Sequence, residues 1–180
     1  MSETVIRIPT LETARLRLRA PAWADFEAYA DFRGSARAAY AGGPFTRAQA
    51  FDQFTAIAGH WLIRGFGRWI VADRQSDRAL GLVGGYYPEG WLEPEIAWAM
   101  FAEAEGKGIA FEAAQAARAY AYDTLGWSSA VSLIAPDNAR SAALAQRLGA
   151  TREGVYHHES YGALDVWRHP SAAALGQEAG

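Results

Sequence analysis

Three strand-like stretches in close succession constrain the fold of this chain more than any other feature. They cover residues 68–73 (RWIVAD), 79–86 (ALGLVGGY) and 95–101 (EIAWAMF), and the connections are short, as in the turn RQSDR. Runs rich in aliphatic and aromatic residues and bounded by turn residues are typical of β-strands. Because short turns join antiparallel strands, the sequence predicts hairpins in the middle of the chain.

A different pattern follows residue 101. An alanine-rich run from residue 109 to about 125 predicts a helix, and residues 130–135 (AVSLIA) predict a buried strand. Residues 136–149 predict a second helix, with Asp137 or Asn138 as its N-cap and Gly149 at its end. The first of these helices carries small residues on the side that we expect to lie close to a sheet: Ala110, Ala113, Ala114, Ala117 and Ala121.

Both ends of the chain add elements. Residues 14–19 (ARLRLR) alternate with the period of a strand, and residues 22–32 predict a short helix. A longer helix is expected from the N-cap Thr46 to Gly65, and the final residues to 168 predict a hairpin. The apolar face expected for the longer helix consists of Phe51, Phe54, Ala58, Trp61 and Leu62.

The order of these elements predicts an α/β fold with a mixed sheet. The length of 180 residues suits a single domain, which we place at residues 1–170. Residues 171–180 (SAAALGQEAG) are small and polar and follow a proline, which predicts a loosely ordered tail. With 51% hydrophobic and 13% aromatic residues, the chain is expected to bury a sizeable core.

Composition excludes several classes of function. Acidic and basic residues are interspersed, with a net charge of −3, so no nucleic-acid-binding surface is expected. The chain has no cysteine, which removes thiolate metal sites and a cysteine nucleophile, and His60, His157, His158 and His169 lack metal-ligand spacing; we expect no metal. The sequence contains neither a signal-peptide pattern nor an apolar run long enough to cross a membrane, so the expected location is the cytoplasm.

The motif EGKG at residues 105–108 places Gly106 and Gly108 around Lys107, directly before the alanine-rich helix. A helix N-terminus attracts anions, and glycine lets the backbone approach a phosphate without a Cβ in the way. The motif does not match GxxxxGK[ST], because Gly108 follows the lysine, nor GxGxxG, because Phe111 takes the place of the third glycine. Alone, it fits a plain glycine turn as well as an anion-binding loop.

The context favours the anion-binding loop, because a second helix start with polar side chains, PDNARS at residues 136–141, follows the next strand. In this order, the motifs resemble the GNAT N-acetyltransferases, and within them the branch of ribosomal-protein-alanine acetyltransferases. The resemblance extends from TARLRLR at residue 13 through EIAWAM, EGKGIAFEA and PDNARSAALAQRLGA to WRHP at residue 170. The family signature [QR]xxGx[GA] falls on residues 105–110, with Glu105 in its first position.

The resemblance implies a GNAT-like fold, which is a mostly antiparallel mixed sheet with one splayed pair of parallel strands and flanking helices. It implies acetyl-CoA as the donor, an amine as the acceptor, and direct attack of the amine in a ternary complex. The pantetheine arm would lie between the splayed strands, against the backbone of Met100, Phe101 and Ala102. The residues implied for the pyrophosphate are those of the glycine loop and the first helical turn: Gly106, Lys107, Gly108, Ile109 and Ala110.

Side chains at the second helix start match further contacts of the family. Asn138 and Ser141 match polar contacts to the ligand, and Asn138 is equally well explained as an ordinary N-cap. Arg140 and Lys107 are candidates for the terminal phosphate, and solvated surface charge explains both of them as well.

Acyl transfer needs a neutral amine, and amines are largely protonated at pH 7, so a base is required. The resemblance assigns this role to Glu95, with Glu93 as the alternative; an acid at a strand end that pairs with an arginine is the competing explanation. The family's tyrosine position is occupied by Ala145, so no general acid is assigned. The oxyanion would be met by a backbone N–H near Phe101. The final hairpin offers other proton donors: Tyr156, His157, His158 and Tyr161.

Two other functions remain open from the sequence: an acyl-CoA-binding module that has lost the chemistry, and a structural α/β domain without a nucleotide. The sequence does not identify the acceptor, which could be a protein N-terminus or a small amine. It also does not decide between a monomer and a homodimer.

Overall fold

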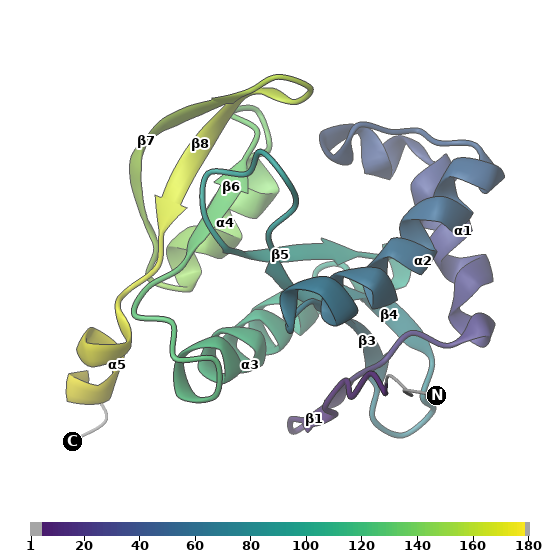
Figure 1. The fold of residues 1–180 in the computed structure, drawn as a ribbon, viewed down its shortest axis with the longest axis horizontal. Coiled ribbons are helices and arrows are strands. Elements are labelled where there is room, and N and C mark those ends of the chain that lie inside the picture. Colours follow the sequence, from purple (N-terminus) through teal and green to yellow (C-terminus); the bar gives the residue numbers. More distant parts are fainter. Residues whose placement is uncertain (1–4, 179–180) are drawn as a thin grey trace.

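The computed structural model describes residues 5–178, which form one eight-stranded sheet with helices on both faces (Figure 1). The strand order is β1-β2-β3-β4-β5-β6-β8-β7. The strands are β1 (Leu11–Glu12), β2 (Leu16–Arg19), β3 (Arg68–Asp73), β4 (Ala79–Tyr86), β5 (Glu95–Met100), β6 (Val131–Ile134), β7 (Thr151–His158) and β8 (Gly162–Arg168). The helices are α1 (Phe26–Gly34), α2 (Arg47–Arg64), α3 (Ile109–Asp123), α4 (Ala139–Arg147) and α5 (Ala172–Glu178), with 3-10 turns η1 (Trp23–Asp25), η2 (Ala36–Ala41) and η3 (Ala102–Ala104).

The predicted mixed α/β sheet is confirmed. Strands β3, β4 and β5 pair antiparallel, as their short connections predict, and β7 and β8 form the predicted hairpin. Within residues 5–178, β5 and β6 are the one parallel pair. The helix α3 provides the long crossover that a parallel pair requires.

The parallel pair β5–β6 is splayed. Only Glu95 and Val131 are in register, and the two strands diverge beyond that point. Two side chains supply hydrogen bonds where the backbone ladder ends. The Ser132 hydroxyl donates to the carbonyl of Ile96 over 2.6 Å, and the Glu95 carboxylate accepts the N–H of Leu133 over 2.8 Å. The opening between the strands is therefore held by specific side-chain contacts.

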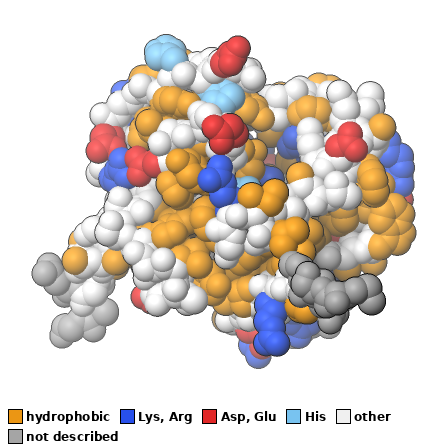
Figure 2. All heavy atoms as spheres, in the orientation of Figure 1, with side chains coloured by type: hydrophobic (Ala, Val, Ile, Leu, Met, Phe, Trp, Pro, Cys, Tyr) orange, Lys and Arg blue, Asp and Glu red, His pale blue; other side chains and the backbone are white. Residues whose placement is uncertain are grey.

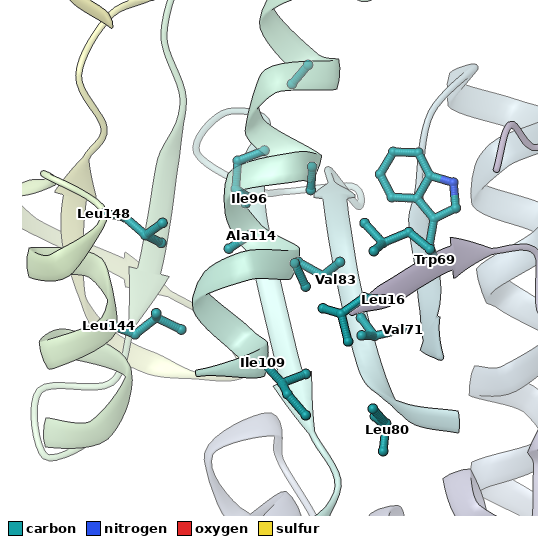
Figure 3. Close-up of a cluster of buried hydrophobic side chains, with 14 of the residues drawn as sticks. Leu16, Trp69, Val71, Leu80, Val83, Ile96, Ile109, Ala114, Leu144 and Leu148 are labelled. Atoms are coloured by element: carbon teal, nitrogen blue, oxygen red, sulfur yellow. The ribbon is translucent and has the colours of Figure 1, made fainter. Parts of the chain in front are cut away.

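Helix α3 packs closely on one face of the sheet. Figure 3 shows Ala114 of this helix beside Val83 and Ile96, which are fully buried. The small-residue side predicted from the sequence is confirmed for four of its members, which are at most 2% exposed: Ala113, Ala114, Ala117 and Ala121. The fifth, Ala110, is partly buried and lies at the cavity described below.

Helix α2 covers the opposite face, and its buried side differs from the prediction. Thr46 is the N-cap as predicted, and it forms a reciprocal capping box with Gln49. Phe51 and Leu62 are 43% and 51% exposed, so their assignment to the apolar face was wrong. Phe51 lies instead at the rim, beside the exposed ring of Trp23. The side chains that α2 buries are Ala50, Phe54, Ile57 and Trp61.

The predicted loose tail contains the helix α5 up to Glu178, and residues 179–180 lie outside the described part of the chain. The N–H of Ala172 donates to the carbonyl of Ser128 over 3.1 Å, and Leu175 packs against the core. The start of this segment is thus attached to the domain where the sequence predicts a loose tail. The division into one domain and a tail stays a prediction.

Candidate active site

A cavity of about 880 Å³ opens between the splayed strands and the helices α1 and α2. Figure 2 shows a hollow on this side of the molecule, between the hairpin β7–β8 and these two helices. The starts of α3 and α4 form one part of its wall, and the first residues of β5 form another. The two helix starts predicted from the sequence and the end of β5 that carries Glu95 therefore line the same cavity.

The start of α3 has a backbone that requires glycine. Gly106 and Gly108 have φ values of +70° and +72°, a left-handed conformation that other residues adopt only with strain. Gly108 is the N-cap, no side chain caps the helix, and the first helical bond runs from Glu112 to Gly108. The N–H groups of Ile109 and Ala110 therefore have no partner within the helix, and both residues line the cavity. This arrangement suits a phosphate.

The charged residues of the glycine loop have defined partners. Lys107 does not line the cavity, and its carbonyl accepts a hydrogen bond of 2.9 Å from Arg15. Glu105, at the position where the family signature has Gln or Arg, lies at the cavity between two guanidinium groups. It forms ion pairs with Arg37 of η2 and Arg140 of α4.

Hydrogen bonds connect the polar side chains at the start of α4. Asn138 is the N-cap, as one of the two predicted candidates, and its Oδ1 accepts the N–H of Ser141 over 3.2 Å. The Ser141 hydroxyl in turn accepts the indole N–H of Trp98 in β5, also over 3.2 Å. Asn138, Arg140 and Ser141 all line the cavity.

The end of β5 contributes one of its three predicted residues to the cavity. Met100 lines it, whereas Phe101 and Ala102 do not. The N–H of Phe101 donates to the carbonyl of Leu80 in β4 over 2.8 Å, so it is not free for a ligand. Backbone groups of successive strand residues point to opposite edges, so those of Met100 face the gap toward β6. Met100 is thus the residue whose N–H fits the predicted oxyanion contact.

Glu95 lies at the inner end of the cavity and is only 5% exposed. Burial raises the pKa of its carboxyl to about 7, an effect that the hydrogen bond from Leu133 and the nearby Arg68 partly oppose. The indole N–H of Trp91 is buried without a hydrogen-bond partner in the described structure, and it also lies close enough to lower this pKa. A carboxyl that titrates near neutral pH is suited to accept a proton from an amine.

Two other residues considered from the sequence lie away from the site. Glu93 precedes β5 and binds Arg168 through two hydrogen bonds of 2.8 and 2.7 Å, outside the cavity. Because β5 begins at Glu95, Glu93 lies before the strand and does not share a strand face with Glu95. Ala145 is fully buried and packs with Trp167.

The final hairpin brings one of its four candidate donors to the cavity. Tyr161 lines it, whereas Tyr156 donates its hydroxyl to the carbonyl of Gly90. His158 accepts the N–H of Ser160 over 3.1 Å. Neither His157 nor His158 lines the cavity.

Sequence reasoning missed two basic residues, Arg33 in α1 and Arg68 in β3, which both line the cavity. No local pattern distinguishes them from surface arginines. His60 also lines the cavity, and its hydrogen bonds fix it as a neutral ring. Its Nδ1–H donates to the carbonyl of Phe66 over 2.7 Å, and its Nε2 accepts the N–H of Tyr87 over 3.0 Å. His60 is therefore a packing residue.

Within residues 5–178, no three His, Asp or Glu side chains lie together as a metal site. No helix in that range has the length and hydrophobicity needed to cross a membrane.

Comparison with known proteins is consistent with this geometry. Residues 15–151 match the model of the acetyltransferase (GNAT) domain. A solved acetyltransferase from Agrobacterium tumefaciens is 34% identical, with 94% of this chain and 99% of that chain covered and a TM-score of 0.84. A putative GNAT-family acetyltransferase from Bordetella pertussis is 27% identical, with coverage of 91% and 100% and a TM-score of 0.76.

A more distant structure shares the fold. It is a putative ribosomal-protein-serine acetyltransferase from Vibrio cholerae, 21% identical, with 89% of this chain and 97% of that chain covered and a TM-score of 0.73. The family match spans most of the sequence, and the fold has the splayed parallel pair with a glycine loop at its end. The chain therefore belongs to the GNAT family and is an N-acetyltransferase that takes its acetyl group from acetyl-CoA.

Proposed function

We propose that this enzyme transfers the acetyl group to a primary amine by direct attack in a ternary complex, with Glu95 as the base. The observation that supports this proposal is the position of a buried carboxyl, with its pKa raised to about 7, in the same cavity as two open helix starts. The carboxylate would take the proton from the attacking amine, directly or through one water molecule. A metal plays no part in the proposed reaction.

The residues at the cavity fit coenzyme A. The N–H groups of Gly108, Ile109 and Ala110 are proposed to bind the pyrophosphate. The αL backbone of Gly106 and Gly108 and the helix start without a side-chain cap support this proposal. The splayed gap beside Met100 has the extended shape and the free backbone groups that a pantetheine arm requires. When bound, acetyl-CoA supplies an activated acyl group with a thiolate as the leaving group.

The remaining contacts proposed from the sequence divide into two groups. Asn138 and Ser141 line the gap and are proposed to contact the arm of the ligand. Arg140 is proposed to bind a phosphate after exchange with Glu105, its present partner. Lys107 lies outside the cavity, so its side chain would contribute screened charge only. The N–H of Met100 is proposed to stabilise the oxyanion.

Thiol release from acetyl-CoA, measured against a panel of primary amines, tests this proposal. We expect amine-dependent release and a product acetylated on nitrogen. A module that only binds acyl-CoA would give tight CoA binding in calorimetry and no amine-dependent release with any member of the panel. That outcome would overturn the proposed reaction and favour the binding module, for which the lack of a tyrosine at Ala145 is the structural argument.

The acceptor class is proposed only as a primary amine. Structures of the same fold include enzymes named for ribosomal proteins and for aminoglycosides, so the fold alone does not favour the ribosomal-protein-alanine branch. Action on a protein N-terminus remains one proposal beside action on a small amine. A cytoplasmic location remains a prediction from the sequence, and a homodimer remains one alternative beside a monomer.

Glu105 offers a test of the proposed phosphate site. Its carboxylate is at the start of the glycine loop and forms ion pairs with Arg37 and Arg140. Replacing Glu105 with Gln removes a negative charge near the pyrophosphate and frees both guanidinium groups. We expect CoA to bind about two- to fivefold more tightly, which is the value of one screened charge interaction. Isothermal titration calorimetry with CoA measures the change.

The matched control is Glu103→Gln, because Glu103 pairs with Arg78 and lies outside the cavity. This variant should leave CoA affinity unchanged. Equal or weaker CoA binding by the Glu105→Gln variant would show that the phosphates do not approach this carboxylate.

A further inference from the structure

Two arginines in the cavity lack the partner that most arginines of this protein have. Among residues 5–178, most arginines form an ion pair with a carboxylate, whereas Arg33 and Arg68 form none. Arg33 is 9% exposed and donates to the side-chain oxygen of Gln53 over 2.6 Å. Arg68 makes no side-chain hydrogen bond in that range, and its guanidinium lies 4.4 Å from the ring centre of Tyr86.

Both arginines line the same cavity. Burial lowers the pKa of Arg33, and the positive charge of Arg68 acts in the same direction. Two like charges beside a partly apolar cavity are unfavourable unless an anion binds between them. Within the described chain, the acidic residues that line the cavity are Glu95 and Glu105, and Glu105 already binds two other arginines.

The position of Arg68 associates the pair with the acceptor rather than with the phosphates of coenzyme A. Its guanidinium lies over Tyr86, and Tyr86 is the register partner of Glu95 at the first residue of β5. The glycine loop follows the opposite end of that strand, after Met100. Six residues of extended strand separate the two ends by roughly 15–20 Å. The charge of Arg68 therefore lies beside the proposed base.

Aromatic side chains enclose the same region. Tyr29, Tyr86, Trp91 and Tyr161 line the cavity there, and the rings of Tyr86 and Tyr161 each contact Trp91 edge to face, at 5.5 and 5.6 Å between centres. An acceptor that fits this wall has an apolar or aromatic body of small size. The two arginines add a requirement for negative charge at one end of it.

From this arrangement we propose that the acceptor carries a carboxylate as well as its amine, and that Arg33 and Arg68 bind the carboxylate while the amine faces Glu95. The inference rests on the proposed amine acetylation and specifies its substrate class. The shared chemistry is that of an amino acid, either free or as a peptide with an acidic residue near its N-terminus. Bidentate guanidinium–carboxylate contacts supply the specificity.

The test compares acceptors that differ in one negative charge. 4-(Aminomethyl)benzoate and 4-(aminomethyl)benzamide have nearly the same shape and the same type of amine. We expect the benzoate to have a kcat/KM about 10- to 100-fold higher, the range for a lost hydrogen-bonded charge. A second pair, the C-terminally amidated peptides Ala-Asp-Gly and Ala-Asn-Gly, differs only in the side-chain carboxylate. It determines whether the carboxylate belongs to a free small molecule or to a peptide.

Two variants assign the effect to the arginines. Arg68→Gln is expected to remove the preference for the benzoate by raising its KM, so that the two acceptors have similar kcat/KM values. Because Arg68 also lowers the pKa of Glu95, both acceptors are compared at a pH where kcat no longer changes. Arg64→Gln is the matched control, because Arg64 also lies over a tyrosine ring, 4.7 Å from that of Tyr87, yet does not line the cavity. Equal kcat/KM values for the two acceptors, or an Arg68→Gln variant that loses both activities equally, would overturn the inference.

A binding measurement separates this inference from the proposed function. Tryptophan fluorescence of the CoA-saturated protein reports binding of benzoate and benzamide without any reaction. If no amine is acetylated while benzoate binds and Arg68→Gln abolishes its binding, the anion site stands and the proposed reaction fails. If amines are acetylated but benzoate binds no better than benzamide, the reaction stands and the inference fails.

Discussion

Replacing Glu95 with Gln is expected to lower kcat at pH 7 by about 10²- to 10⁴-fold, the range for loss of a general base. The amide can still accept the N–H of Leu133, so the strand opening is preserved, but it cannot take a proton. CoA affinity should remain unchanged, because Glu95 lies at the end of β5 remote from the glycine loop. Steady-state kinetics together with CoA calorimetry measure both effects.

The pH dependence of kcat is a second measurement of the proposed role of Glu95 as the base. Burial raises the pKa of Glu95 to about 7, so the carboxyl is protonated and inactive as a base below that pH. We expect kcat to rise between about pH 6 and 8 with an apparent pKa near 7, and the Gln variant to lack this rise. A variant that keeps the rise would assign the titration to another group.

The contribution of Glu95 to folding stability should decrease as the pH rises, whereas kcat should increase. The pKa of Glu95 is higher in the folded protein than the ordinary value of 4.5, so the unfolded chain releases this proton first as the pH rises. The contribution of Glu95 to stability is therefore present below pH 4.5 and is lost as the pH rises toward 7. Glu95→Gln should remove this loss.

The matched control for catalysis is Glu93→Gln, the same chemical change two residues earlier. Glu93 binds Arg168 outside the cavity, so this variant should keep kcat within about twofold, although it loses a partly exposed ion pair. A loss of kcat in the Glu93 variant comparable to that in the Glu95 variant would contradict the assignment of the base.

Local sequence signals predicted the elements of the fold that depend on local physics. The bounds of β3 and β4 agree with the prediction to the residue, since turn residues bound both strands. The N-cap at Asn138 depends on one local hydrogen bond, in which its side chain accepts the N–H of Ser141 three residues later. Such features need no knowledge of the rest of the chain.

The features that the sequence could not predict depend on distant partners. Phe51 has the spacing of a buried residue in α2, but its side chain is exposed at the edge of the helix pair, where it contacts Trp23 of η1 and Phe26 of α1. The sequence leaves Glu93 as the alternative to Glu95, and the contact that holds Glu93 outside the cavity comes from Arg168, 75 positions later. Arg33 and Arg68 come from α1 and β3, so only the fold brings them to one cavity.

A buried polar chain connects α3 to the splayed strands, and His169 is its centre. Arg118 donates to the carbonyl of Leu148 over 2.6 Å and to Nδ1 of His169 over 3.2 Å. The proton on Nε2 of His169 then points to the Ser132 hydroxyl at 3.0 Å, and Ser132 donates to the carbonyl of Ile96. The histidine is thus the link between a helix and the hydroxyl that bridges β5 and β6.

Replacing His169 with Ala is expected to lower the free energy of unfolding by about 2–4 kcal/mol. The substitution leaves Arg118 and Ser132 with unpaired buried atoms, and it removes a side chain that is 2% exposed. Urea denaturation at pH 7.5, followed by far-UV circular dichroism, measures the loss. His157→Ala is the matched control, because His157 is exposed and should change stability by at most about 0.5 kcal/mol.

The pH dependence of stability distinguishes the loss of this network from a simple packing defect. Burial, together with the charges of Arg118 and Arg168, lowers the pKa of His169 to about 3, below the ordinary value of 6.5. Between these values only the unfolded chain binds the proton, so this residue makes the protein less stable as the pH falls from 6.5 toward 3. His169→Ala should therefore cost less stability at pH 5 than at pH 7.5. An equal loss at both pH values would show that His169 contributes packing alone, without the buried neutral ring that the hydrogen bonds require.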